Sequence, residues 1–186
     1  MMLHPVVDLA LNDTIIKIAQ GYLGSEHVYI KSIDAWWKTP TKPDDYSNTA
    51  DFFHRDCDQN RWLNMFLFLT PVSRTDGCHV FIENTHHRGS FDGYLYSDRR
   101  YSDQELVTAE ATHNLKYFES EKPLIVLEDT WGFHRATECQ SPRFIIQIRY
   151  STTMYGAPVN ARTKDSRNLL SYLSNDRFTD WKKLKA

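Results

Sequence analysis

Cysteine is scarce in this chain of 186 residues, and it forms no paired motif. The three cysteines, Cys57, Cys78 and Cys139, contain no Cys-x-x-Cys spacing, and any pairing leaves one over. This excludes a disulfide-rich secreted scaffold and a zinc ribbon, because both need paired cysteines. We therefore expect free thiols and a reducing, cytoplasmic environment.

Several common catalytic signatures are also missing. None of the seven glycines belongs to a phosphate-binding loop or to a Gly-x-Ser-x-Gly nucleophile elbow, and there is no His-Glu-x-x-His zinc motif. These absences exclude P-loop NTPases, α/β-hydrolases and the common zinc proteases from the function classes.

Long apolar runs and an excess of positive charge are absent as well. The formal net charge is −2, which gives no reason to expect a nucleic-acid-binding surface. No apolar run approaches the ~20 residues of a membrane-spanning helix, and the amino terminus lacks the basic and apolar regions of a signal peptide. We expect a protein that binds neither nucleic acid nor membrane; these properties do not bear on its oligomeric state.

What is present indicates one domain, residues 1–186, with an all-β core. Hydrophobic residues make up 41% and charged residues 25%, which is ordinary for a globular chain of this length. Alternating patterns rich in β-branched and aromatic residues predict strands at about 27–37, 50–55, 62–70, 78–83, 113–118, 123–128, 131–135 and 143–151. Many short strands at regular spacing are typical of a closed or double-sheet β architecture.

Helices are predicted at both ends of this core. Residues 8–23 have helical apolar spacing, with Asn12 or Asp13 as N-cap and Gly21 or Gly24 as stop. Short helices are also expected within residues 165–186.

The segment at about 85–111 breaks the strand pattern. It is rich in Gly, Ser, Asp, Tyr and Arg, and its Ser102-to-Glu105 spacing is a capping box that predicts a short helix. A long irregular insertion in a compact domain is usually functional, so we interpret it as a lid. Before it, Asp76-Gly77 predicts a tight reversal between two strands.

Three residues have the types and spacing of a metal site. His54 and Asp56 are two residues apart on a predicted strand, so their side chains share one face. His134 lies on a later predicted strand. Two imidazoles and one carboxylate form a facial triad, which leaves three positions of an octahedral metal open.

Arginine and polar residues on neighbouring strands are the next candidates. Arg143 begins an apolar strand and presents the planar fork that holds a carboxylate bidentately. Alternation places Arg149 on the same face, where it could hold an anionic substrate, replace Arg143 as anchor, or form an ion pair at the rim. On the strand after residue 61, the face with Trp62, Asn64 and Phe66 is predicted to line the interior.

These segments together resemble the phytanoyl-CoA dioxygenase-like branch of the Fe(II)/2-oxoglutarate-dependent oxygenases. The resemblance covers about half the chain and is carried, in order, by His54-Arg55-Asp56, Trp62–Thr70, Asp76-Gly77-Cys78, Thr85-His86-His87-Arg88-Gly89, Asp129–Arg135 and Arg143–Gln147. It implies a double-stranded β-helix, or jelly roll, with Fe(II) bound by the triad.

The same resemblance implies a reaction and further roles. Arg143 would hold the distal carboxylate of 2-oxoglutarate, with Asn64 and Phe66 beside the co-substrate, and Trp62 and Arg149 near the substrate. The implied reaction uses dioxygen to hydroxylate an unactivated C–H bond of a small polar molecule, and it releases succinate and CO2. Two alternatives are a cupin-like metalloenzyme that does not use 2-oxoglutarate and a non-catalytic jelly-roll binding protein. Against the cupin-like alternative, the chain lacks a His-x-His spacing followed by a later Glu.

Overall fold

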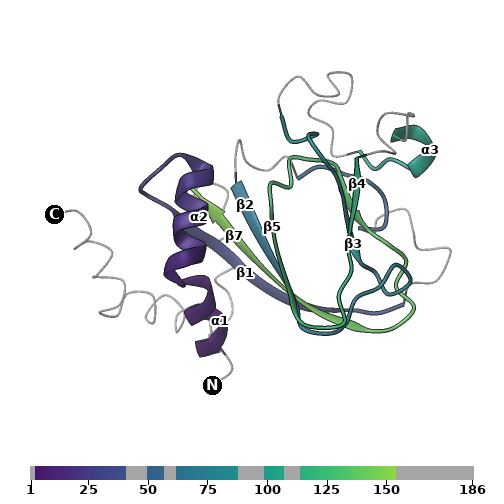
Figure 1. The fold of residues 1–186 in the computed structure, drawn as a ribbon, viewed down its shortest axis with the longest axis horizontal. Helices are drawn as coiled ribbons and strands as arrows, with labels where there is room; N and C mark the ends of the chain where they lie inside the picture. The colour runs from purple at the N-terminus through teal and green to yellow at the C-terminus, as the bar shows by residue number, and fades with distance from the viewer. Residues whose placement is uncertain (1–2, 41–49, 57–61, 88–98, 107–113, 154–186) are drawn as a thin grey trace. The chain divides into compact units, whose positions relative to one another are not determined.

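A computed structural model of the chain describes residues 3–40, 50–56, 62–87, 99–106 and 114–153 (Figure 1). Its contacts divide the chain into residues 1–155 and residues 156–186, and the second unit, with the helices predicted there, lies outside the described residues. The described elements are α1 (Leu3–Ala10), α2 (Asp13–Leu23), β1 (Tyr29–Lys38), β2 (Trp62–Phe68), β3 (His79–Ile82), α3 (Asp103–Leu106), β4 (Leu115–Phe118), β5 (Leu124–Glu128), β6 (His134–Ala136) and β7 (Arg143–Ser151).

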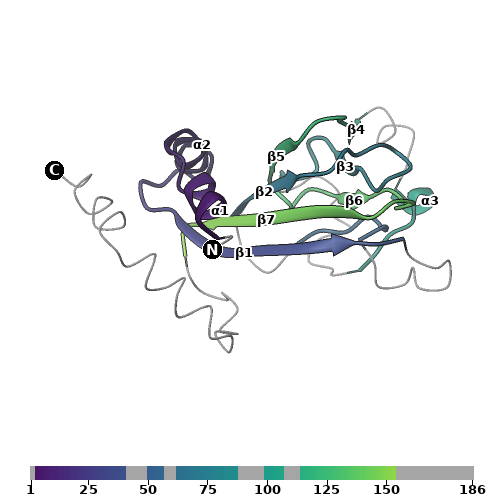
Figure 2. The ribbon, with the colours of Figure 1, turned by 90° about the horizontal axis from the view of Figure 1, so that it is seen from below.

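The strands form two antiparallel sheets. One has the order β1-β7-β2-β5 and the other the order β4-β3-β6. Long β1 and β7 lie side by side, and the shorter strands complete the sandwich (Figure 2). This arrangement confirms the predicted all-β core.

Alternation along β7 separates two environments. Its outward side chains Ile146, Ile148 and Tyr150 are buried. The Tyr150 hydroxyl donates a hydrogen bond of 2.9 Å to the Ala10 carbonyl at the end of α1. Burial raises the pKa of this hydroxyl, which stays protonated and continues to donate. The amino-terminal helices therefore cover the outer face of the four-stranded sheet at its Tyr150 end, whereas Trp37 and Ile125 are exposed on the same face.

The ends of α2 lie where the sequence predicts, whereas α1 begins at Leu3, before the predicted helical segment at residues 8–23. Asn12 is the N-cap of α2, because its side chain accepts a hydrogen bond from the Thr14 backbone. Gly24 ends α2 in a left-handed conformation with φ +67°, which glycine adopts without the steric cost of a side chain. None of the helices in the described part of the chain is long and apolar enough to span a membrane.

Two predicted strands differ from the structure. Residues 50–55 form no strand; they make only two isolated bridges, Phe53 with Tyr101 and His54 with His134. The strand predicted at 131–135 begins only at His134, because the Asp129 carboxylate accepts from the Trp131 backbone and closes a turn first. Local side-chain hydrogen bonds of this kind compete with the strand pattern.

The Asp76-Gly77 turn is not a hairpin. β2 pairs with β5 and β7, whereas β3 pairs with β4 and β6, so this segment carries the chain from one sheet to the other. Gly77 has φ +74°, and a Cβ built on it would lie 2.6 Å from Nε of Arg143. The glycine therefore provides both the backbone conformation and the space for the arginine.

The predicted lid is described only at its ends. Thr85, Tyr101 and Leu106 are buried there, and Ser102 precedes α3 and pairs with Glu105 as the capping box predicts. Residues 88–98 and 107–113, which form most of the predicted lid, lie outside the described residues.

Replacing the two left-handed glycines by alanine separates backbone strain from side-chain contact. Gly24→Ala is expected to lower the free energy of unfolding by about 1 kcal/mol, which is the cost of the left-handed conformation for a residue with a Cβ. Contact adds nothing to this cost, because nothing lies within 4 Å of the added methyl group. Gly77→Ala is expected to cost about 1–3 kcal/mol more, because its methyl group overlaps the Arg143 guanidinium. Urea unfolding of both variants measures the difference, and equal losses would contradict the contact.

Candidate metal centre

The three predicted ligands converge in space. His54, Asp56 and His134 each offer a ligand atom, and these atoms lie within 4.8 Å of one another. Nε2 of His54 is 4.0 Å from one oxygen of Asp56, and Nε2 of His134 is 3.9 Å from the other. Among the described residues this is the one cluster of His, Cys, Asp or Glu side chains with such geometry.

Backbone hydrogen bonds hold this cluster together. His54 and His134 form a reciprocal pair, in which each N–H donates to the other's carbonyl at 3.0 Å. The N–H of Asp56 donates to the Thr130 carbonyl at 2.9 Å. The main chain of His54 is therefore fixed to His134 of β6, and the main chain of Asp56 is fixed to the turn that precedes β6.

The same nitrogen is left free on both imidazoles. Nδ1 of His54 lies 2.9 Å from the Phe52 carbonyl, and Nδ1 of His134 lies 3.0 Å from the Gly132 carbonyl. A carbonyl oxygen only accepts, so Nδ1 carries the proton in each ring and Nε2 keeps a lone pair toward Asp56. This is the orientation that outer hydrogen bonds give to metal-binding histidines.

The electrostatics of His54 favour the neutral, ligating form. Burial first, and then the neighbouring His134, lower the pKa of His54 from 6.5 to about 2. A positive charge on His54 is costly in a poorly solvated site.

A cavity of about 180 Å³ opens beside the three ligands. It reaches from the cluster to the inner face of β7, and β1, β2 and β3 also contribute to its wall. Its lining residues are Trp36, Lys38, Ala50, His54, Asp56, Phe66, Phe68, His79, His134, Arg135, Ala136, Arg143, Ile145, Gln147 and Arg149.

Arg143 is a buried cation in this wall. It is 4% exposed, and its Nε and Nη1 have no hydrogen-bond partner among the described residues. Burial lowers the pKa of the guanidinium below its ordinary value. A bound anion would satisfy these donors and offset the desolvation of the charge.

Arg149 lines the same cavity but is already neutralised. Nη1 donates to Asp34 and to Ser32, each at 2.9 Å, and Nη2 donates to Gln147 at 2.9 Å. The predicted common inward face of β7 is confirmed, since Arg143 and Arg149 both reach the cavity together with Ile145 and Gln147.

The three residues predicted on β2 lie in different places. Phe66 lines the cavity, whereas Trp62 and Asn64 do not, although both are buried. The Trp62 ring lies beneath the Arg149 guanidinium, 5.7 Å from centroid to Cζ. The Asn64 amide is hydrogen-bonded to the Thr130 hydroxyl.

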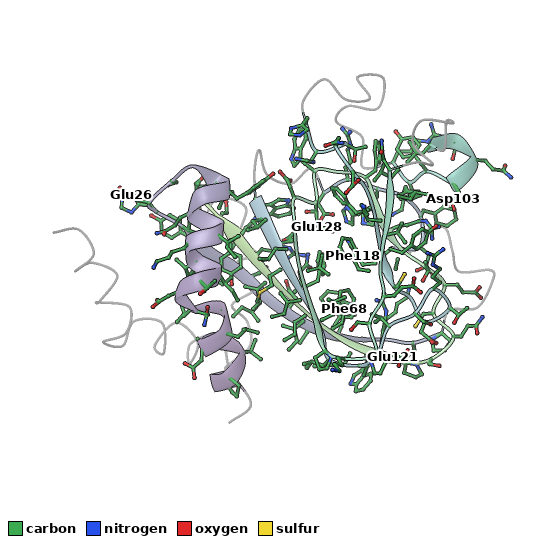
Figure 3. All side chains as sticks on the ribbon, viewed as in Figure 1. Glu26, Phe68, Asp103, Phe118, Glu121 and Glu128 are labelled. Atoms are coloured by element: carbon green, nitrogen blue, oxygen red, sulfur yellow. The ribbon has the colours of Figure 1, made fainter. Side chains whose placement is uncertain are left out.

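Sequence reasoning missed one pair of residues in this region. His79 lines the cavity, and its Nε2 is 2.6 Å from an oxygen of Glu128 on the opposite sheet. Figure 3 shows Glu128, Phe118 and Phe68 in the space between the two sheets. Glu128 was the signal for this pair in the sequence. It is the one charged residue in the run Leu124–Glu128, and a carboxyl group buried with such a strand needs a partner.

The fold resembles that of several solved structures. EctD from S. alaskensis, solved with 2-oxoglutarate and 5-hydroxyectoine, matches with a TM-score of 0.57 and 19% identity over 81% of this chain and 54% of its own. ThoJ, a non-heme monooxygenase, matches with a TM-score of 0.55 and 14% identity over 77% of this chain and 53% of its own. SnoN, a non-heme alpha ketoglutarate dependent epimerase from nogalamycin biosynthesis, matches with a TM-score of 0.54 and 15% identity over 78% of this chain and 57% of its own.

At these identities the likeness defines the fold, which is the predicted jelly roll with flanking helices. This chain spans little more than half the length of each of these three structures. No protein-family model matches the sequence, and no curated protein matches it.

The lowered pKa of His54 predicts a pH dependence of stability for the metal-free protein. In the unfolded chain His54 is protonated below pH 6.5, whereas the folded state resists that proton down to about pH 2. His54 therefore does not lower the free energy of unfolding above pH 6.5, and it lowers that free energy by about 1.4 kcal/mol for each pH unit below 6.5. His54→Asn is expected to flatten this slope between pH 6 and 4 in urea unfolding, and identical slopes would contradict the assignment.

Proposed function

We propose that this protein is a non-haem Fe(II)/2-oxoglutarate-dependent dioxygenase that hydroxylates an unactivated C–H bond of a small polar molecule. The observation that carries this proposal is one cavity that contains both a two-histidine, one-carboxylate cluster and a buried arginine with unpartnered donors. The cluster can hold a metal, and the arginine can hold the far end of a dicarboxylate.

The residues of the cluster fit Fe(II). His54, Asp56 and His134 would hold Fe(II), because two imidazoles and one carboxylate are the ligand set of non-haem Fe(II) oxygenases, which keep positions open for a co-substrate and dioxygen. When bound, Fe(II) and 2-oxoglutarate supply oxidative chemistry that couples release of succinate and CO2 to oxygenation of the substrate. The chain supplies ligation, orientation and exclusion of water.

Arg143 is the better of the two candidate anchors for 2-oxoglutarate. Among the described residues, Nε and Nη1 of Arg143 lack partners, whereas the Arg149 guanidinium lacks one only for Nε and is engaged by Asp34 and two polar side chains. Phe68 lies against Arg143, 5.5 Å from ring centroid to Cζ, and lowers the local exposure to water. A carboxylate bound there would form a charge-assisted, bidentate pair.

The comparisons support this proposal at the level of fold. EctD carries 2-oxoglutarate in its solved structure, ThoJ is a monooxygenase, and SnoN is an epimerase. The fold therefore serves more than one outcome, and hydroxylation is the more specific part of the proposal. The ordered motifs from His54 to Gln147 support the phytanoyl-CoA dioxygenase-like branch.

Anaerobic titration of Fe(II) and 2-oxoglutarate into the metal-free protein tests this function. We expect a visible charge-transfer band in wild type and no band in His134→Ala. Arg143→Ala is expected to weaken 2-oxoglutarate binding by roughly 30-fold or more, since a buried charge pair loses about 2 kcal/mol or more when one partner is truncated. Arg149→Ala distinguishes the two anchors and is expected to keep the affinity for 2-oxoglutarate.

Three outcomes would redirect the assignment. Tight metal binding without the band would exclude 2-oxoglutarate and favour a cupin-like metalloenzyme. Absence of metal binding would leave a jelly-roll binding protein. A loss caused by Arg149→Ala but not by Arg143→Ala would reverse the assignment of the anchor.

A further inference from the structure

A buried hydrogen-bonded pair, His79 and Glu128, lies beside the candidate metal-binding cluster. His79 on β3 and Glu128 on β5 join the two sheets at 2.6 Å, and their side chains are 8% and 5% exposed. The His79 ring stacks on that of His134, with centroids 5.6 Å apart and planes at 28°, and its other neighbours include Phe66 at 4.9 Å. A wall of the metal cavity is thus held in place by a carboxylate behind it.

A second buried contact reaches the carboxylate ligand. Asn64 and Thr130 are both fully buried, and the Asn64 amide is hydrogen-bonded to the Thr130 hydroxyl. The Thr130 carbonyl accepts the N–H of Asp56 at 2.9 Å. Asn64 therefore lies behind Asp56, with one residue between them.

The two contacts meet between β2 and β5. Asn64 and Glu128 are directly opposite each other in the register, so their side chains share the inner face. Oδ1 of Asn64 and Oε1 of Glu128 have no hydrogen-bond partner among the described residues. Both are acceptors, and two acceptors cannot satisfy each other.

A half-turn of the Asn64 amide resolves both groups. The Thr130 hydroxyl would then donate to Oδ1, and Nδ2 would face Glu128, the residue opposite Asn64 in the register. With that step, hydrogen bonds would run from His79 through Glu128, Asn64 and Thr130 to the backbone of Asp56. A carboxylate buried in an apolar strand needs such complete pairing.

We propose that Glu128 and Asn64 are positioning residues, and that their network holds His134 and Asp56 in the geometry that binds the metal. This inference rests on the proposed metal centre. It assigns Asn64 a place behind the carboxylate ligand in place of a contact with 2-oxoglutarate. Loss of such outer partners typically lowers metal affinity by 10–100-fold.

Co(II) binding to the otherwise metal-free protein tests the network without any activity assay. Calorimetry gives the affinity, and the visible spectrum of bound Co(II) reports the ligand geometry. His79→Phe with Glu128→Leu replaces the buried pair by apolar groups, and Phe suits a site already walled by Phe66 and Phe118. We expect this double variant to unfold near the wild-type urea midpoint but to bind Co(II) 10–100-fold more weakly with an altered spectrum.

Three single variants separate positioning from general stability. Asn64→Leu is expected to weaken Co(II) binding by about 10-fold or more. Glu128→Gln keeps an acceptor for His79, and its amide can donate to Asn64 Oδ1 when the Asn64 amide turns back so that Nδ2 donates to Thr130, so affinity should stay within about 3-fold of wild type. Val126→Ala, at a buried inward position of the same strand, should lower the urea midpoint without changing Co(II) affinity.

Each outcome bears on one proposal or the other. Wild-type affinity in the double variant and in Asn64→Leu would overturn the network while leaving the metal centre intact. Equal weakening by Val126→Ala would show that stability alone sets affinity and would also overturn it. Failure of wild type to bind Co(II) would overturn the metal centre itself, and this inference with it.

Discussion

The reciprocal backbone pairing of His54 with His134 is the constraint on which the candidate site depends. The two hydrogen bonds of 3.0 Å join segments that are distant in sequence and place two imidazoles side by side, with ring centroids 4.3 Å apart. Asp56 is held beside the two imidazoles because its N–H donates to the Thr130 carbonyl. Backbone hydrogen bonds therefore bring the three residues together, and the orientation of their side chains depends on the groups packed around them.

The cations around the cavity differ in whether they have an acidic partner. Most of the cations that line it have acidic partners: Lys38 has Asp51, Arg135 has Asp103 and Arg149 has Asp34. Arg143 keeps two unpartnered donors in a desolvated position, which makes it the one place in the described wall where an incoming anion gains most. In the proposed function, this asymmetry would orient a dicarboxylate with one end at Arg143 and the other toward the cluster.

The sequence predicted the parts of this structure that depend on local pattern. Alternation located β1, β2 and β7, the caps located the ends of α2, and residue type with spacing brought His54, Asp56 and His134 to one place. Sequence reasoning failed where contacts between distant strands determine the structure. The pairing of His79 with Glu128 crosses the two sheets, and neither residue reveals its partner from its own strand. Residues 50–55 have the composition of a strand but find only two bridging partners.

The turn at Asp129 connects helix α2 to the segment that holds Asp56. One carboxylate oxygen closes the turn on the Trp131 backbone, and the other accepts the hydroxyl of Tyr22 from α2. The next residue, Thr130, carries the carbonyl that holds Asp56. Hydrogen bonds thus connect an outer helix to the backbone that holds Asp56, so we expect a displacement of α2 to change the position of this carboxylate in the candidate metal site.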